Sequence, residues 1–121
     1  MNGDQAVVLV LEDDPALLGL LCAAIEDWGY RALPAPGSSE ALRLAADEPR
    51  IDLALADVGL LERASVDVLG QVRAAHPGLR SVQMSGYQSA AAEELDEGRF
   101  LLKPFALEAL EAALADALAA P

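Results

Sequence analysis

The sequence predicts an α/β protein with five parallel strands in one sheet and five helices distributed over both faces of that sheet. Two observations carry this prediction. Short apolar runs alternate along the chain with segments in which apolar residues recur at helical spacing, and the connections between them are short. In addition, the first run, residues 6–11, is apolar at every position, which is typical of a strand buried on both faces of a parallel sheet. Alternation of this kind requires right-handed crossovers and places helices on both faces.

The first half of the chain predicts three strands and two helices. Asp14 followed by Pro15 is typical of an N-cap and a first helical position, and Gly29 is a helix-ending residue. The expected elements are a strand over 6–11, a helix over 15–28, a weak strand over 31–34, a helix starting within 37–40 and running to about 48, and a strand over 52–57.

The second half predicts two further strands and three helices. The last helix shows an apolar stripe with acidic residues off it; the stripe consists of Leu107, Leu110, Leu114 and Leu118. The other expected elements are a helix over 65–75, a strand over 80–84, a short helix over 89–95 and a strand over 100–102.

Composition excludes several classes of function. Among 121 residues, 20 are acidic and 8 basic, which gives a formal net charge of −12. A chain this acidic lacks the basic clusters that contact nucleic-acid phosphates or anionic membranes, so we expect no direct nucleic-acid partner and no membrane binding. One cysteine excludes an internal disulfide and a cysteine-based zinc site. No basic residue precedes the first apolar run, so we expect no secretory signal and a cytoplasmic protein.

Polar side chains gather at the ends of the predicted strands. Ligands of open α/β sheets bind outside the carboxyl ends of the strands, so the residues that follow each strand are the candidates for a site. These residues are Glu12, Asp13 and Asp14 after the first strand, Asp57 at the end of the third, Ser85 after the fourth and Lys103, the one lysine of the chain, after the fifth.

Carboxylates that converge on one pocket repel each other unless a cation is present. Hard oxygen ligands with an open face suit Mg²⁺. Lys103 can pair with an incoming anionic group, and Asp57 can serve as a nucleophile that forms an aspartyl phosphate. Ser85 is placed to hydrogen-bond the transferred phosphoryl oxygens.

At these residues the chain resembles the receiver domains of two-component response regulators. The resemblance covers essentially the whole chain and rests on motifs in the right order at the right strand ends. They are Glu12-Asp13, Asp57, Ser85-Gly86, Lys103-Pro104-Phe105 and Phe100. It implies a flavodoxin-like receiver fold with strand order 2-1-3-4-5. It also implies that residues 1–121 are a single receiver domain, with its core over about 6–118 and no output domain.

The resemblance implies a phosphoryl-accepting switch. Asp57 would take a phosphoryl group from a sensor histidine kinase or a histidine phosphotransfer protein. Asp13, Asp57 and the backbone carbonyl of Gly59 would bind Mg²⁺, with Glu12 acting largely through water. Such a domain is an acceptor that phosphorylates and dephosphorylates itself, so we expect no turnover enzyme.

Further roles follow from the same resemblance. Ser85 and Lys103 would contact the phosphoryl group. Phe100 is either plain core or a switch residue that changes rotamer as Ser85 moves. Gly59 and Tyr87 flank the pocket and would tune the lifetime of the phosphoryl group. The remodelled surface would comprise the helix over 89–95, the strand over 100–102 and the last helix, and would face an output partner or a second copy in a homodimer.

The chain departs from the family pattern in the loop after Asp57, where Leu61 and Ser65 replace the usual proline and glycine. The stretch from 85 to 103 is also shorter than usual by roughly one helical turn. All pocket positions are retained, and a cis Lys103–Pro104 bond is expected from the family.

Three alternatives compete with this interpretation. The altered loop and the short segment favour a pseudo-receiver, which would have the same fold and act as a phosphorylation-independent interaction module. A phosphatase with an aspartate nucleophile would need a second acid two residues later, where this chain has Gly59. A nucleotide-binding fold would need a glycine-rich loop after the first strand, which the sequence lacks.

Overall fold

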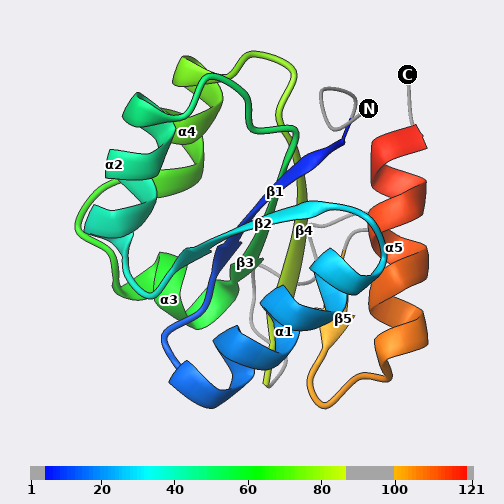
Figure 1. Ribbon diagram of the computed structural model, residues 1–121. Helices are drawn as coiled ribbons and strands as arrows, with labels where there is room; N and C mark the ends of the chain where they lie inside the picture. Colours follow the sequence, from blue (N-terminus) through cyan, green and yellow to red (C-terminus); the bar gives the residue numbers. More distant parts are fainter. Residues whose placement is uncertain (1–4, 87–99, 120–121) are drawn as a thin grey trace.

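The computed structural model describes residues 5–86 and 100–119, and these residues contain five strands and five helices (Figure 1). In chain order these elements are β1 (Val7–Leu11), α1 (Pro15–Asp27), β2 (Arg31–Ala35), α2 (Ser38–Asp47), β3 (Leu53–Asp57), α3 (Val58–Arg63), α4 (Val68–Ala75), β4 (Arg80–Ser85), β5 (Phe100–Leu102) and α5 (Leu107–Ala119).

The strands form one sheet with the order β2-β1-β3-β4-β5, and every neighbouring pair is parallel. This order and orientation confirm the predicted fold class. Because all strands run the same way, their carboxyl ends lie at one edge, and the loops after β1 and β3 meet there in the lower part of Figure 1. That edge is where the sequence places its polar residues.

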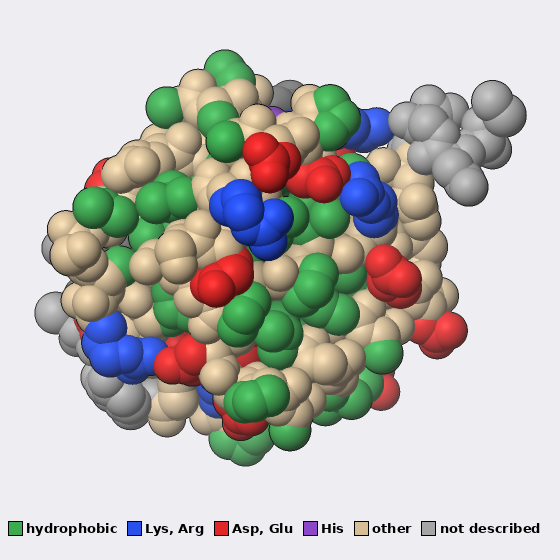
Figure 2. All heavy atoms as spheres, turned by 60° about the vertical axis from the view of Figure 1, so that its left-hand side comes forward, with side chains coloured by type: hydrophobic (Ala, Val, Ile, Leu, Met, Phe, Trp, Pro, Cys, Tyr) green, Lys and Arg blue, Asp and Glu red, His purple; other side chains and the backbone are tan. Residues whose placement is uncertain are grey.

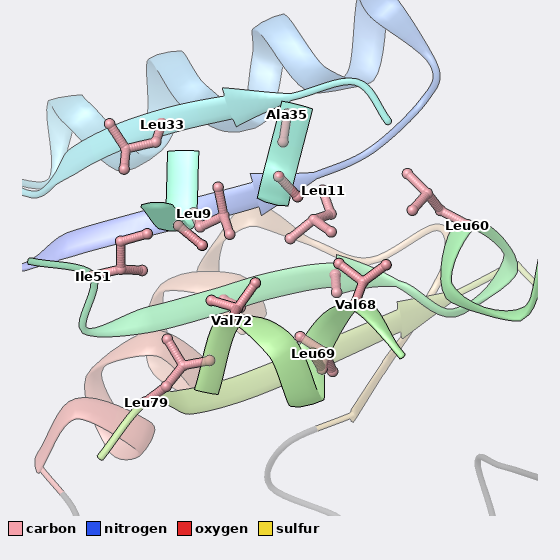
Figure 3. Packing of buried hydrophobic residues seen from close by; sticks show 14 of the residues in the cluster. Leu9, Leu11, Leu33, Ala35, Ile51, Leu60, Val68, Leu69, Val72 and Leu79 are labelled. Atoms are coloured by element: carbon pink, nitrogen blue, oxygen red, sulfur yellow. The ribbon is translucent and has the colours of Figure 1, made fainter. Parts of the chain in front are cut away.

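The sheet is covered on both faces, which explains the uniformly apolar first strand. Leu9 and Leu11 of β1 pack with side chains of α2 and α4 on one face, together with Leu33 and Val72 (Figure 3). On the other face, the alternate β1 residues pack against α1 and α5; that cluster includes Val8, Val10, Leu21, Ile25, Leu110 and Leu114. All five residues of β1 are buried, as are all five of β3. The ends of these strands are therefore held rigidly.

Helix α1 begins at the residues that the sequence predicts, after the Asp14 cap and at Pro15. The Asp14 carboxylate accepts a hydrogen bond from the backbone N–H of Ala16 at 3.0 Å, and Pro15 opens the helix. After the helix ends at Asp27, Gly29 adopts a φ of 97°, which glycine reaches without the strain of a side chain. The first crossover is thus fixed by its own sequence.

The segment after β3 differs from the prediction. The sequence pattern predicts a single helix over 65–75, but α3 begins directly after Asp57 and α4 begins only at Val68. The reason is capping: the Asp57 carboxylate accepts from the N–H of Leu60, and that of Asp67 accepts from the N–H of Gly70. Helix α4 therefore starts after the Asp67 cap and not at residue 65.

The predicted stripe of the last helix is also partly wrong. Leu107 is 38% exposed, while Leu110 and Leu114 are buried as expected. Small residues complete the packed face, since Ala113 and Ala117 are buried between the leucines. The helix expected over 89–95 lies outside the described residues.

Charged side chains are mixed on the surface. On the face shown in Figure 2, basic side chains lie next to acidic ones and do not form one basic surface. Ion pairs of the described residues include Arg31 with Glu48 and Arg43 with Asp47. None of the helices in the described part of the chain combines the length and hydropathy needed to cross a bilayer.

Cys22 on α1 is half-buried and is the one cysteine of the chain. Burial raises the pKa of its thiol, and the negative charge of Glu26 raises the pKa further. Because the thiolate is the reactive form, we expect Cys22 in the folded protein to react with iodoacetamide more slowly near neutral pH than a small free thiol. Intact mass against time measures the rate. Unfolding in denaturant should restore the ordinary rate, and equal rates in the folded and unfolded protein would contradict this expectation.

Candidate functional site

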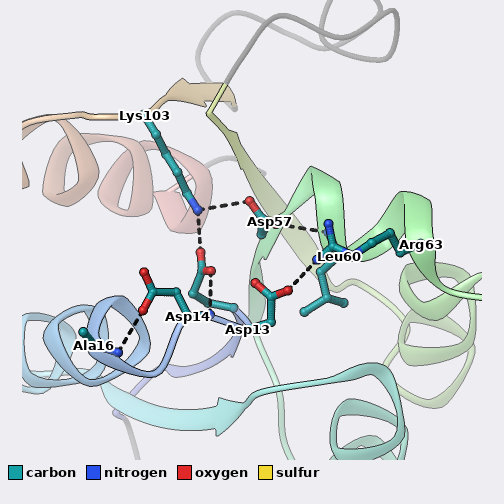
Figure 4. Close-up of polar contacts among 8 residues, drawn as sticks. Asp13, Asp14, Ala16, Asp57, Leu60, Arg63 and Lys103 are labelled. Atoms are coloured by element: carbon teal, nitrogen blue, oxygen red, sulfur yellow. Dashed lines mark hydrogen bonds and ion pairs between the residues drawn. The ribbon is translucent and has the colours of Figure 1, made fainter.

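The candidate site lies at the carboxyl edge of the sheet, where four strand ends contribute side chains. Glu12 and Asp13 follow β1, Asp57 ends β3, Ser85 ends β4 and Lys103 follows β5. Figure 4 shows Asp57 directed toward the Lys103 ammonium group, while Asp13 is directed toward Arg63. Residues far apart in sequence are thus brought together by parallel strand pairing alone.

Lys103 links two carboxylates. Its Nζ lies 2.6 Å from Glu12 Oε1 and 3.1 Å from Asp57 Oδ1. Burial acts to lower the pKa of the Lys103 ammonium, but its hydrogen bonds to Glu12 and Asp57 and their negative charges outweigh burial and raise that pKa. The lysine is therefore fully charged at neutral pH.

Glu12 is an acid inside the protein. The residue is 1% exposed, and each of its carboxylate oxygens has a partner: Oε1 contacts Lys103, and Oε2 accepts from the N–H of Asp14 at 3.1 Å. A buried charge needs such partners, because an unpaired carboxylate in the interior costs several kcal/mol or takes up a proton. Lys103 therefore has a structural function as well as a place in the site.

Asp57 is held in one orientation. The residue is 8% exposed; Oδ2 accepts from the N–H of Leu60 at 3.0 Å, while Oδ1 contacts Lys103. The carboxylate sits at a strand end and at the same time caps α3. A carboxylate fixed in this way presents its oxygens to the edge of the sheet with little freedom to turn.

The acidic side chains fit a divalent cation. Glu12, Asp13 and Asp57 each offer a carboxylate oxygen, and these atoms all lie within 4.8 Å of one another. Opposite ligands of one octahedral Mg²⁺ lie about 4.2 Å apart, so small movements or one bridging water would suffice. The donors are oxygens only, which is the set that Mg²⁺ prefers.

Arg63 is not among the site residues predicted from the sequence, but it belongs to the same group of side chains. Arg63 ends α3, and its Nη2 lies 2.5 Å from Asp13 Oδ2 (Figure 4). The available signal is its spacing: Gly59 and Arg63 lie four residues apart, so a helix starting directly after Asp57 places them on one face. The sequence pattern predicts a loop after Asp57, and in a loop a spacing of four residues does not place two residues on one face. The spacing becomes informative only once α3 is known.

Ser85 ends β4 at this edge of the sheet, whereas Phe100 lies at the other end of β5. Ser85 is 3% exposed, and its backbone carbonyl accepts from the N–H of Lys103 at 2.7 Å, which ties the ends of β4 and β5 together. Phe100 opens β5 opposite Gln83 and is partly buried. The Lys103–Pro104 bond is cis. Tyr87 lies outside the described residues.

Comparisons with known proteins agree on one family. The family model of the response regulator receiver domain matches residues 8–115. The transcriptional regulatory protein ZraR of Klebsiella oxytoca is 31% identical over 123 residues, a match that covers 98% of this chain and 28% of that protein. The chain thus spans less than a third of the length of this relative.

Solved structures share the fold. The response regulator receiver protein of Sinorhizobium medicae WSM419 superimposes with a TM-score of 0.82 at 21% identity and covers 97% of each chain. A response regulator protein of Burkholderia pseudomallei, with a phosphorylated aspartic acid, calcium ion and citrate, has a TM-score of 0.75 at 27% identity. That match covers 91% of this chain and 66% of the other.

Proposed function

The chain belongs to the receiver domain family of two-component response regulators, and from this premise we propose that it is a phosphoryl-accepting switch with Asp57 as the acceptor. The observation that carries the proposal is the Asp57 carboxylate itself. It is buried at a strand end, oriented by Leu60 and paired with Lys103. The neighbouring acids Glu12 and Asp13 complete a set of oxygen donors.

The proposed step is a transfer of a phosphoryl group between two proteins. An Asp57 carboxylate oxygen attacks the phosphorus of a phosphohistidine on a sensor kinase or phosphotransfer protein. The new oxygen–phosphorus bond forms as the nitrogen–phosphorus bond breaks, and the histidine nitrogen leaves with its electron pair. Lys103, which carries its positive charge at neutral pH, is placed to contact the phosphoryl oxygens, with Ser85 on the neighbouring strand end.

Magnesium is the proposed cofactor. Asp13, Asp57 and the backbone carbonyl of Gly59 would hold the ion, with Glu12 acting through water. When bound, Mg²⁺ neutralises charge that builds up on the transferred phosphoryl group. The phosphorylated aspartic acid and calcium ion of the Burkholderia pseudomallei protein support both the acceptor and the metal by similarity.

The phosphoryl group would then act as a switch. It adds up to about two negative charges and three acceptor oxygens beside Lys103 and Ser85. Phe100, on the strand that precedes Lys103, is the side chain proposed to respond, and the change would reach β5 and α5. In this proposal the domain is an acceptor in the cytoplasm that signals to an output partner, and is not a turnover enzyme.

The proposal predicts phosphorylation that depends on Mg²⁺. We expect purified protein incubated with a small-molecule phosphodonor such as phosphoramidate to gain the mass of one phosphoryl group when Mg²⁺ is present. Excess EDTA should remove the gain, because the donor set is then left without its cation. Intact-protein mass spectrometry gives the readout, and circular dichroism shows that the protein is folded in both samples.

A folded protein that gains no phosphoryl group under these conditions would contradict the proposal. That outcome would favour the pseudo-receiver, an interaction module that works without phosphorylation. Phosphorylation of equal extent with and without EDTA would contradict the metal alone.

A further inference from the structure

Arg63 reaches from the end of α3 into the group of acidic side chains. Its guanidinium Nη2 contacts Asp13 Oδ2, and the two side chains are 62% and 49% exposed. Lys103, the other cation of the group, pairs with Glu12 and Asp57 instead. The Arg63–Asp13 pair therefore spans the gap between the loop after β1 and the helix after β3 (Figure 4).

Gly59 has no side chain, and the Arg63 guanidinium lies close to the space that a side chain at this position would take. A Cβ atom at position 59 would lie 3.0 Å from Arg63 Nη1 and 3.2 Å from Asp57 Oδ2. Both distances are shorter than ordinary van der Waals contacts. A side chain at 59 would therefore press against both the guanidinium and the Asp57 carboxylate. Arg63 therefore lies over the turn of backbone that follows Asp57, on the side of the carboxylates.

The charges of these residues nearly cancel. Glu12, Asp13 and Asp57 supply three negative charges, and Lys103 and Arg63 supply two positive ones, which leaves one negative charge. A divalent cation that took Asp13 as a ligand would have to displace the guanidinium or lie beside it, and two cations at one carboxylate repel.

We propose that Arg63 competes with Mg²⁺ for the Asp13 carboxylate and so sets how tightly this receiver domain binds its metal. This inference rests on the proposed function, because it takes Asp13 as a metal ligand. Arg63 acts here as a counter-ion built into the chain, and a metal at Asp13 must either replace its ion pair or bind beside its positive charge.

Removal of the competitor should tighten metal binding. We expect Arg63→Ala to lower the dissociation constant for Mg²⁺ by roughly three- to tenfold, which corresponds to the loss of one exposed ion pair together with the repulsion between the two cations. Because the pair is exposed, added salt should screen it. The difference between the wild type and the variant should therefore shrink at high ionic strength.

Arg43→Ala is the matched control. Arg43 lies on α2, its side chain is 64% exposed, and it pairs with Asp47 at 3.9 Å in a similar exposed ion pair. The control removes the same charge from the same residue type away from the carboxyl edge of the sheet. Arg43→Ala should therefore bind Mg²⁺ with the affinity of the wild type. Both substitutions are at exposed positions, so both proteins should fold.

The experiment is isothermal titration calorimetry of Mg²⁺ into EDTA-treated, dialysed protein, with Asp13→Asn as a second comparison. Tighter binding by Arg63→Ala alone supports the proposal. If Arg63→Ala binds like the wild type, or more weakly, while Asp13→Asn binds poorly, Arg63 is not a competitor and the metal site stands. If none of the folded proteins binds Mg²⁺, the proposed metal site is wrong and the inference falls with it.

Discussion

Asp57→Asn is expected to abolish phosphorylation by a small-molecule phosphodonor, while the wild type gains one phosphoryl group in the same reaction. The physical reason is nucleophilicity: an amide oxygen carries no full negative charge and does not form a stable bond to phosphorus under these conditions. The shape of the side chain is kept. The amide oxygen of the variant can still accept from the N–H of Leu60, which donates to Asp57 Oδ2 in the wild type. The variant should therefore fold and keep α3.

Asp47→Asn is the control for this variant. It makes the same chemical change on α2, where Asp47 has a 64% exposed side chain and pairs with Arg43. Intact mass after equal times compares the three proteins. Undiminished phosphorylation of Asp57→Asn would reject Asp57 as the acceptor, and loss of phosphorylation in Asp47→Asn would show that the assay responds to net charge.

Lys103→Met should have the largest effect on stability. The substitution leaves Glu12, whose side chain is 2% exposed, and Asp57 without their shared cation. Breaking a fully buried pair in this way costs about 3–5 kcal/mol, and because the lysine side chain is 22% exposed we expect about 2–4 kcal/mol. Urea unfolding in EDTA measures the free energy of unfolding.

A second substitution separates lost charge pairing from lost packing. In Glu12→Gln/Lys103→Met no buried charge is left at position 12, so the double variant should recover at least half of the loss. Arg31→Met, which breaks an exposed ion pair with Glu48, should cost about 1 kcal/mol or less. If Lys103→Met has the same free energy of unfolding as Arg31→Met, the buried Glu12 carboxylate does not need Lys103 as its partner.

Much of the site can be predicted from the sequence, because parallel strand pairing brings the residues at the strand ends to one edge of the sheet. Once the strands ending near Leu11, Asp57 and Leu102 are identified, the residues after them must meet at one edge. The apolar strands β1 and β3 are buried on both faces, so their ends are unambiguous. This is why Glu12 and Lys103, 91 positions apart, could be grouped from the sequence alone.

The features that the sequence did not predict depend on tertiary contacts between residues far apart in the chain. Helix α3 has six residues and begins directly after an aspartate that ends a strand, so local propensity gives it little support. Its cap is Asp57, whose position the sheet determines. Arg63 could be connected with Asp13 only once that helix was known. The exposure of Leu107 and the burial of Ala113 and Ala117 likewise depend on how α5 packs on the sheet, which the spacing of the leucines does not show.

Whether Asp57 itself carries the phosphoryl group is tested most directly by trapping the acyl phosphate. Phosphorylated protein treated with sodium borohydride is reduced at the phosphorylated carboxyl, which converts that aspartate to homoserine, and peptide mass spectrometry then locates it. We expect homoserine at position 57 and nowhere else, in a Mg²⁺-dependent amount. Homoserine in place of Asp13 or another acid, or a phosphorylated protein with unmodified Asp57, would contradict the proposed acceptor.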